Sequence, residues 1–187
     1  MLTTQVWIGF IFDIILIVFA LRFMWGMMRL GKISPFIRTR MPVAEEVAEA
    51  FGTLPEGSVL IDPGCGDGRV LFAIAKRNPH TTFIGIELRL LPYILALLEK
   101  RKHPDLNITF IHGNFFDQDL SSATHIYTYL YAHVMDSLLP KLLKELKPGT
   151  TLLSVDFPFS KKQTEHVTTL KSAEQLKLGR TLYVYRF

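Results

Sequence analysis

The sequence has very little cysteine and no internal repeats or low-complexity segments. Cys65 is the single cysteine among 187 residues. An intramolecular disulfide is therefore excluded, as is a zinc site built on several thiolates, and the chain suits a reducing compartment. A chain of this length fits one domain of ordinary size with a short additional segment.

Charge is almost absent from the N-terminal region. From Val6 to Leu21 the sequence VWIGFIFDIILIVFAL contains one charged residue, Asp13, and its apolar character continues to about residue 28. A helix needs roughly 20 mostly apolar residues to cross a bilayer. Trp7 and Trp25 lie near the two ends, where amphipathic rings favour the headgroup region. These features predict an N-terminal transmembrane anchor over residues 1–30.

Two other interpretations of this stretch were weighed. A cleaved signal peptide is disfavoured, because no basic residue precedes the apolar run and no small-x-small cleavage site follows it. A buried or interfacial amphipathic helix remains open, because Asp13 and Arg22 interrupt the stretch. An unpaired charge at mid-bilayer costs roughly 2.5 to 3.5 kcal/mol on the insertion scale.

Acidic residues are absent from the segment that follows. Residues 31–41 form a predicted basic juxtamembrane linker, and the bases of this region are Arg29, Lys32, Arg38 and Arg40. The positive-inside rule then predicts a single-pass protein with its N-terminus outside and the bulk of the chain, residues 42–187, on the cytoplasmic side, or on the matrix side in a mitochondrion. The linker is expected to attract anionic lipid rather than nucleic acid, and it can fold over a pocket as a lid. A solvated linker with chance charges is the alternative.

Residues 42–187 alternate between strand-like and helix-like runs. Short apolar runs follow in order as SVLID, TTFIGIE, NITFIHG, THIYTYLY and TTLLSVDF, and helical patterns precede or separate them. This alternation predicts an α/β fold, a Rossmann-like doubly wound and mostly parallel sheet. The tail from Thr164 holds two strand-like runs around a polar turn, which predicts a closing antiparallel hairpin.

Three glycines follow the first strand of this domain. Gly64, Gly66 and Gly68 form GxGxG, which differs from the GxGxxG of dinucleotide binders. Asp62 precedes them, and a carboxylate there repels a pyrophosphate but suits a ligand with an ammonium group and hydroxyls. S-adenosylmethionine is such a ligand. A tight turn without a ligand explains one glycine better than three.

Two further candidate ligand-binding positions follow, at the ends of the next two strands. Glu87 ends TTFIGIE, where an acid accepts hydrogen bonds from ribose hydroxyls; a helix N-terminal acid is the alternative. Asn114 offers an amide to the adenine edge, and Phe115 or Phe116 can stack on the ring, although phenylalanines are also common in cores.

With these motifs in order, the sequence resembles the class I, seven-β-strand methyltransferases over residues 34–187. DPGCGDGR corresponds to their first motif, Glu87 to the second-strand acid and GNFFD to the adenine motif. The resemblance implies S-adenosyl-L-methionine as cofactor and no metal. It implies these cofactor-binding residues: Asp62, Gly64, Cys65, Gly66, Asp67, Gly68, Glu87, Asn114 and Phe115.

A narrower resemblance joins the N-terminal apolar segment, PFIRTR, the DxGxGDGR motif and the short C-terminal hairpin. This combination is similar to the membrane-anchored protein-lysine methyltransferases that modify the ATP synthase c subunit and the adenine nucleotide carrier, and to their prokaryotic relatives. The resemblance implies a bilayer and a membrane-protein substrate as partners and no nucleic acid. It leaves the oligomeric state open.

The fourth strand-like run ends in IYTYLYAHV, where this fold usually carries its catalytic group. The Asn/Asp-Pro-Pro-aromatic box of adenine-N6 and glutamine methyltransferases is absent. Tyr129, Tyr131 and His133 can line an aromatic channel that desolvates a lysine amine and lowers its pKa. Alternating tyrosines are equally typical of a half-buried strand. Asp156, after the fifth run, either orients the amine or caps the next turn.

The sequence thus predicts a membrane-anchored S-adenosylmethionine-dependent methyltransferase that acts on a lysine side chain of a membrane-associated protein. Two alternatives stay open at this point. The same enzyme fold can act on a lipid-soluble small molecule, such as a quinone precursor or a phospholipid headgroup. The chain can also be a non-catalytic module that binds the cofactor.

Overall fold

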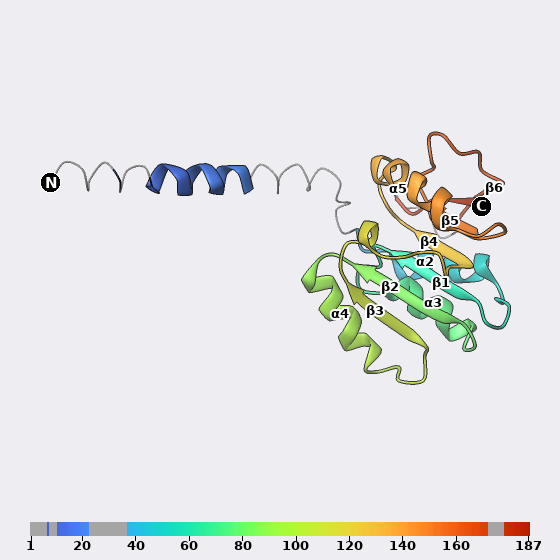
Figure 1. Ribbon diagram of the computed structural model, residues 1–187. Helices are drawn as coiled ribbons and strands as arrows, with labels where there is room; N and C mark the ends of the chain where they lie inside the picture. The colour runs from blue at the N-terminus through green and yellow to red at the C-terminus, as the bar shows by residue number, and fades with distance from the viewer. Residues whose placement is uncertain (1–6, 8–10, 23–36, 172–177) are drawn as a thin grey trace. The chain divides into compact units, whose positions relative to one another are not determined.

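The computed structural model describes residues 7, 11–22, 37–171 and 178–187. The chain divides into two compact units, residues 1–33 and 34–187 (Figure 1). In the first unit, residues 11–22 are helical. Within the described ranges, no helix combines the length and the apolar character that crossing a membrane requires. The anchor predicted over residues 1–30 includes residues 1–6, 8–10 and 23–30, which lie outside the described ones, so it stays a prediction.

A seven-stranded sheet forms the centre of the second unit, in the order β3-β2-β1-β4-β5-β7-β6. The strands are β1 (Val59–Pro63), β2 (Thr82–Glu87), β3 (Ile108–His112), β4 (His125–Thr128), β5 (Thr151–Val155), β6 (His166–Thr169) and β7 (Thr181–Arg186). The first five pair in parallel, whereas β7 runs antiparallel to both β5 and β6. The predicted doubly wound sheet with a C-terminal antiparallel hairpin is confirmed.

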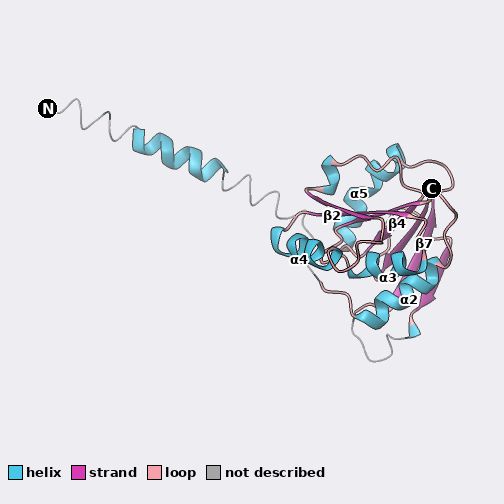
Figure 2. Cartoon of the chain, turned by 90° about the horizontal axis from the view of Figure 1, so that it is seen from below, coloured by secondary structure: helices cyan, strands magenta, loops and turns pink. Residues whose placement is uncertain are grey.

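Among the described residues of the second unit, four α-helices cover the sheet unevenly. They are α2 (Met41–Phe51), α3 (Arg69–Arg77), α4 (Leu90–Lys100) and α5 (Ala132–Glu145), and a short 3-10 turn, η1 (Phe115–Asp117), follows β3. Figure 2 shows α2, α3 and α4 on one face of the sheet and α5 on the other. Each helix corresponds to a helical pattern in the sequence.

Alternate side chains of each strand supply the two cores. Leu60 of β1 packs with buried residues of α2 and α3 on the first face, and Ile61 packs with α5 on the second. Leu71 and Leu138 are fully buried on the two sides. Burying such a side chain contributes roughly 1.5 to 3 kcal/mol, so this alternation fixes the register of the strands.

The end of β4 differs from the prediction. The sequence predicted a strand through Tyr131, but β4 ends at Thr128, so the half-buried-strand explanation of the alternating tyrosines fails beyond that residue. Tyr131 instead precedes α5, and its carbonyl accepts the N–H groups of Val134 and Met135. Helix initiation therefore outweighs strand propensity here.

The order and register of the strands indicate where the sheet can bind a ligand. The order of strands reverses between β1 and β4, and these two strands pair only through Leu60 with His125 and Ile61 with Ile126. Asp62 and Pro63 continue along β2 without a partner in β4. In open α/β sheets, ligands bind at the carboxyl ends of strands beside such a reversal.

Candidate active site

The glycine loop leaves the end of β1 and leads into α3. The N–H groups of Gly64 and Cys65 both donate to the carbonyl of Ile86, at 2.8 and 3.1 Å. Gly64, Gly66 and Gly68 have φ values of 100°, 59° and 76°, a region that favours glycine. The loop therefore bends sharply and stays close to β2.

Packing explains two of these glycines without a ligand. A Cβ atom on Gly64 would lie 2.9 Å from Cδ2 of Leu130, and one on Gly68 would lie 2.6 Å from Cζ of Phe110. The tight-turn alternative thus accounts for Gly64 and Gly68. Gly66 differs, because its N–H group points to a carboxylate at the end of the neighbouring strand.

That carboxylate belongs to Glu87, which is buried. Its Oε2 accepts the N–H of Gly66 at 2.9 Å, and its Oε1 accepts the N–H of Arg89, just before α4, at 2.7 Å. Each oxygen keeps a further lone pair, so the side chain is fixed in place and can still accept hydrogen bonds from two hydroxyl groups.

Asp62 provides a second buried acid beside Glu87, with 3% of its surface exposed. Burial raises the pKa of Asp62 well above its usual value, and the nearby charge of Glu87 raises it further. Two neighbouring buried carboxylates are unfavourable unless a cation or donor joins them. A ligand that brings both an ammonium group and hydroxyls satisfies this pair.

Asp67 of the loop binds the segment that precedes α2. Its Oδ2 lies 2.9 Å from Nε of Arg38 and 2.7 Å from Nη2 of Arg69. Arg69 also donates to the carbonyl oxygen of Thr39 at 2.6 Å. Burial alone would raise the pKa of Asp67, but hydrogen bonds from Arg69 and Arg38 lower it. The carboxylate is thus engaged by two arginines, and its direct contact with a cofactor stays a prediction.

The residues predicted to contact adenine form the turn after β3. Gly113 N–H donates to the carbonyl of Glu87 at 2.9 Å, which holds this turn beside the end of β2. Oδ1 of Asn114 accepts the N–H of Phe116 at 3.1 Å and leaves the amide nitrogen available as a donor. The rings of Phe115 and Phe116 have centroids 4.6 Å apart, and both are half-buried against the second core.

Tyr129 and Asp156 connect the ends of β4 and β5. The hydroxyl of Tyr129 donates to Oδ2 of Asp156 at 3.2 Å. Burial raises the pKa of Tyr129 and the charge of Asp156 raises it further, so the phenol stays protonated. Asp156 also accepts the N–H groups of Gly179, Arg180 and Thr181, and it adopts a φ of 61°. These backbone contacts lie in the loop before β7 and not in the turn that follows β5, where the sequence predicted a cap, and the role in orienting an amine stays a prediction.

Tyr131 and His133 lie farther along the chain. The ring of Tyr131 packs 4.9 Å from that of Phe157 and stacks 6.2 Å from that of His133. His133 is exposed in the first turn of α5. The aromatic group therefore continues from the end of β4 to the surface, with Tyr129 at its buried end.

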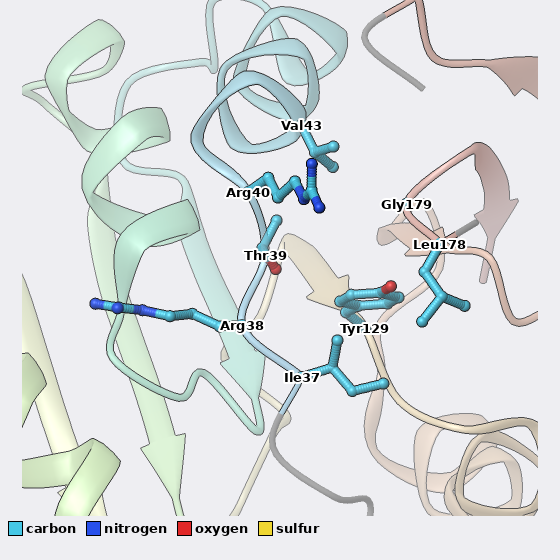
Figure 3. Close-up of a pocket in the computed structure, with 8 residues that line it drawn as sticks. All are labelled: Ile37, Arg38, Thr39, Arg40, Val43, Tyr129, Leu178 and Gly179. Atoms are coloured by element: carbon cyan, nitrogen blue, oxygen red, sulfur yellow. The ribbon is translucent and has the colours of Figure 1, made fainter. Parts of the chain in front are cut away.

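A pocket of about 230 Å³ opens next to Tyr129. It is lined by Ile37, Arg38, Thr39, Arg40, Val43, Tyr129, Leu178 and Gly179 (Figure 3). In Figure 3, Ile37, Tyr129 and Leu178 lie around one space, whereas Arg38 points away from Tyr129. All four predicted catalytic residues are described, and of these Tyr129 lines the pocket. Asp156 binds two of the lining residues, Tyr129 and Gly179.

Comparison with known proteins identifies the family. The ANTKMT methyltransferase domain matches residues 62–166 of this chain. The chain belongs to this family. A protein-lysine N-methyltransferase of Saccharolobus islandicus (strain REY15A) is 30% identical over 153 residues, which cover 81% of this chain and 92% of that protein.

Solved structures of methyltransferases are also similar to this methyltransferase. An RNA methyltransferase from Salinibacter ruber, in complex with S-adenosyl-L-homocysteine, has a TM-score of 0.68 and 29% identity over 80% of this chain and 93% of that one. An S-adenosylmethionine-dependent methyltransferase from Geobacter sulfurreducens, with the same ligand, shares the fold, with a TM-score of 0.51 and 21% identity over 66% of this chain and 50% of that one. The chain is an S-adenosylmethionine-dependent methyltransferase, and the non-catalytic alternative is set aside.

The residues at the carboxyl ends of β1, β2 and β3 fit this cofactor. Asp62 and Glu87 would supply buried carboxylates for an ammonium group and a ribose diol, and Asn114 would supply an amide for the adenine edge. When bound, S-adenosylmethionine supplies a methyl group activated by a sulfonium sulfur. These assignments stay predictions, as do those of Cys65 and Phe115. Cys65 is buried, and its Sγ lies near Gly85 on the sheet side of the loop.

Three contributors to the site were missed from the sequence. Arg38 and Arg69 hold the loop acid Asp67, and Gly85 of β2 makes room for the loop, since a Cβ there would lie 2.7 Å from Sγ of Cys65. PFIRTR and DPGCGDGR were both recognised as motifs, but nothing in their spacing indicated that they bind each other. A glycine inside a strand pattern was the available signal for Gly85.

Proposed function

We propose that this enzyme methylates the side-chain nitrogen of a lysine in a membrane-associated protein. The observation that carries the proposal is the pocket beside Tyr129, with apolar walls and a phenol linked to a carboxylate. The relative from Saccharolobus islandicus, named as a protein-lysine N-methyltransferase, supports the same substrate class.

The pocket suits the shape and polarity of a lysine side chain. Ile37, Val43 and Leu178 offer apolar contacts to the four methylene groups, and the ring of Tyr129 adds an aromatic wall. A protonated lysine is a poor nucleophile because its nitrogen has no lone pair. Burial among apolar groups lowers the pKa of an amine, and so does the positive charge of Arg40 on the pocket wall. Both effects favour the neutral amine that attacks, and they act against the negative charge of Asp156 behind Tyr129, which favours the protonated amine.

The Tyr129–Asp156 pair can orient this amine. The phenol of Tyr129 gives its hydrogen to Asp156, so its oxygen keeps lone pairs that accept an N–H from the substrate. One hydrogen bond of this kind holds the nitrogen, and its own lone pair is then free to point at the methyl group. Reaction forms an N–C bond, breaks the S–C bond with its electron pair going to sulfur, and leaves an ammonium that releases a proton to water.

Attachment to a membrane is the second half of the proposal. The helical residues 11–22 carry large apolar side chains at almost every position, and the basic residues Arg29, Lys32, Arg38 and Arg40 follow. We infer a single membrane-bound N-terminal segment, with the catalytic domain on the side where these bases lie, the cytoplasm or the matrix. Confinement to one surface raises the effective concentration of a membrane substrate.

The test is methyl transfer in a membrane extract with cofactor labelled at the methyl group. The full-length enzyme should label lysine residues of a membrane protein, and an Asp62→Asn variant should label them much less at the same subsaturating cofactor concentration. Label in the lipid fraction would support the lipid-soluble small-molecule alternative instead. Label in RNA would support the activity named for the Salinibacter ruber relative, against the expectation that no nucleic acid is a partner.

A further inference from the structure

Helix α4 exposes its apolar side to solvent. Its outward-facing residues are Leu90, Leu91, Ile94, Leu95, Leu97 and Leu98, and Leu91 reaches 69% exposure. Its buried residues are Pro92 and Ala96. A surface helix of a globular protein normally shows the reverse arrangement, with apolar residues toward the core. α3 follows that rule, because Val70 to Ala75 are all buried.

The exposed residues of α4 form one continuous face. At about 100° per residue, the six side chains fall within an arc of roughly 160°. Within α4, whose residues are all described, no polar side chain falls in that arc. Tyr93, Glu99 and Lys100 lie on the half-buried side, and Lys100 donates to the carbonyl of Leu106. We name this set of six residues the α4 face.

Positive charges flank the α4 face at both ends. Arg89 precedes the helix, and Arg101 and Lys102 follow it, all three exposed. The one acid in the helix, Glu99, is paired with Lys102 at 2.7 Å and with His103 at 3.5 Å. An aliphatic stripe between basic ends is typical of a helix that lies in the interface of an anionic bilayer.

Protein partners fit the α4 face less well. Protein interfaces are usually anchored by tryptophan, tyrosine or arginine in pockets, whereas this face is purely aliphatic. A helix of this length covers about 16 by 10 Å, roughly 160 Å², against about 800 Å² per partner in a stable dimer. We propose that the α4 face inserts into the headgroup boundary of an anionic lipid bilayer.

This contact would bring the carboxyl ends of the strands, where the cofactor is expected to bind, to the membrane. α4 begins three residues after Glu87, and the N–H of Arg89 is bonded to that carboxylate at 2.7 Å. Lipid contact along α4 therefore fixes the orientation of the catalytic domain on the surface. The significance of this lipid contact rests on the proposed membrane attachment, whereas the evidence for the contact itself comes from α4 alone.

The test uses an environment-sensitive dye on a cysteine introduced by Leu91→Cys in the full-length protein. The matched control is Leu143→Cys, because Leu143 is a similarly exposed leucine, at 63%, on α5. Cys65 is buried and burial raises the pKa of its thiol, so it reacts slowly with the dye. The proteins are mixed with vesicles of phosphatidylcholine with or without phosphatidylglycerol.

Insertion predicts a blue shift of the dye at position 91 and its quenching by lipid-bound quenchers in the anionic vesicles, with no change at position 143. If the chain floats with the vesicles while the dye at 91 stays in water, the inference is overturned although membrane attachment stands. If the dye at 91 is already shielded without lipid, a protein segment covers the face and the inference is likewise overturned.

A pair of acidic substitutions in the α4 face provides an activity readout. Leu91→Glu with Leu95→Glu should lower methylation of the membrane-embedded target at least tenfold and leave S-adenosylhomocysteine affinity within twofold, whereas Leu143→Glu should change neither. Equal activity of the paired variant and the wild type would count against the α4 face. If the dye inserts but lysine is not methylated, the substrate proposal fails and the lipid contact is retained.

Discussion

Arg38 and Asp67 join the segment before α2 to the glycine loop across 29 positions of sequence. Nε of Arg38 lies 2.9 Å from Oδ2 of Asp67, and the same carboxylate binds Arg69. Arg38 also lines the pocket beside Tyr129, although its side chain points away from Tyr129, so this residue belongs both to the pocket wall and to the contacts of the glycine loop. The segment at residues 37–40 is thus bonded to the glycine loop and to the start of α3.

Removing this arginine should weaken cofactor binding modestly. Arg38 is 63% exposed, so Arg38→Ala should raise the Kd for S-adenosylhomocysteine by about 2- to 5-fold, within the range for pairs with an exposed partner. Arg77→Ala is the control, because it removes a surface pair with Glu49 away from the loop. Calorimetry that gives the same Kd for both variants would contradict a role of Arg38 at the loop.

Asp62 and Asp67 should respond in opposite ways to loss of their charge. Burial makes ionised Asp62 unfavourable in the free protein, so Asp62→Asn should raise the unliganded Tm near neutral pH. Asp67→Asn removes two ion pairs and should lower it. Asp62→Asn should also raise the Kd for S-adenosylmethionine by about 10- to 100-fold, the loss of one hydrogen bond to a charged group. Equal Tm shifts in the two variants, measured by calorimetry, would refute this assignment.

The pH dependence of binding should carry the signature of Asp62. Its folded pKa is raised, so its contribution to stability is present below the unfolded pKa of about 3.9 and is lost as pH rises through the folded value. A bound ammonium group requires the carboxylate, so affinity for S-adenosylhomocysteine should increase with pH over the same window. Titrations of Asp62→Asn should lack that increase. A wild-type affinity that falls with pH there would show that Asp62 does not hold the ammonium.

Much of the fold was predictable because its local signals agree. Each parallel strand is a short apolar run, and glycine, asparagine or proline ends most helices, so elements such as β2 and α3 were recognised from their sequences. Glu87 was recognised because an acid at the end of the second strand has a defined place in this type of sheet. The narrow GxGxG loop was equally local.

The remaining features depend on contacts between distant residues. Tyr127, Tyr129 and Tyr131 alternate as a strand would, and only the packing of α5 decides that β4 ends at Thr128. The pair of Arg38 with Asp67 has no periodicity to reveal it. The same holds for Asp156, whose carboxylate binds backbone groups more than 20 positions away.

Asp156 should be essential for the loop before β7. Its carboxylate accepts backbone N–H groups of Arg180 at 2.7 Å and Thr181 at 3.1 Å, and its φ of 61° is a conformation that asparagine tolerates and alanine does not. Asp156→Ala should cost about 1.5 to 3 kcal/mol, or roughly 3 to 12 °C in Tm. Asp156→Asn should cost clearly less. Thermal unfolding with both variants equally destabilised would argue against the capping role.

Two N-terminal deletions should separate the anchor from the segment that binds the loop. Removing residues 1–28 leaves Arg38 and Thr39 with their partners Asp67 and Arg69, so cofactor affinity should stay within about twofold, a change below 0.5 kcal/mol. Membrane association and methylation of a membrane target should fall sharply if the proposed anchor is correct.

Removing residues 1–40 also deletes the pocket wall at Ile37 and Arg40. This longer deletion should weaken cofactor binding more than Arg38→Ala does, because the hydrogen bond from Arg69 to Thr39 is lost as well. Flotation with vesicles and calorimetry measure the two effects independently. Equal cofactor affinity in both deletions would show that residues 37–40 do not support the glycine loop. Unchanged activity on membranes after the shorter deletion would show that the N-terminal segment is not what brings the enzyme to its substrate.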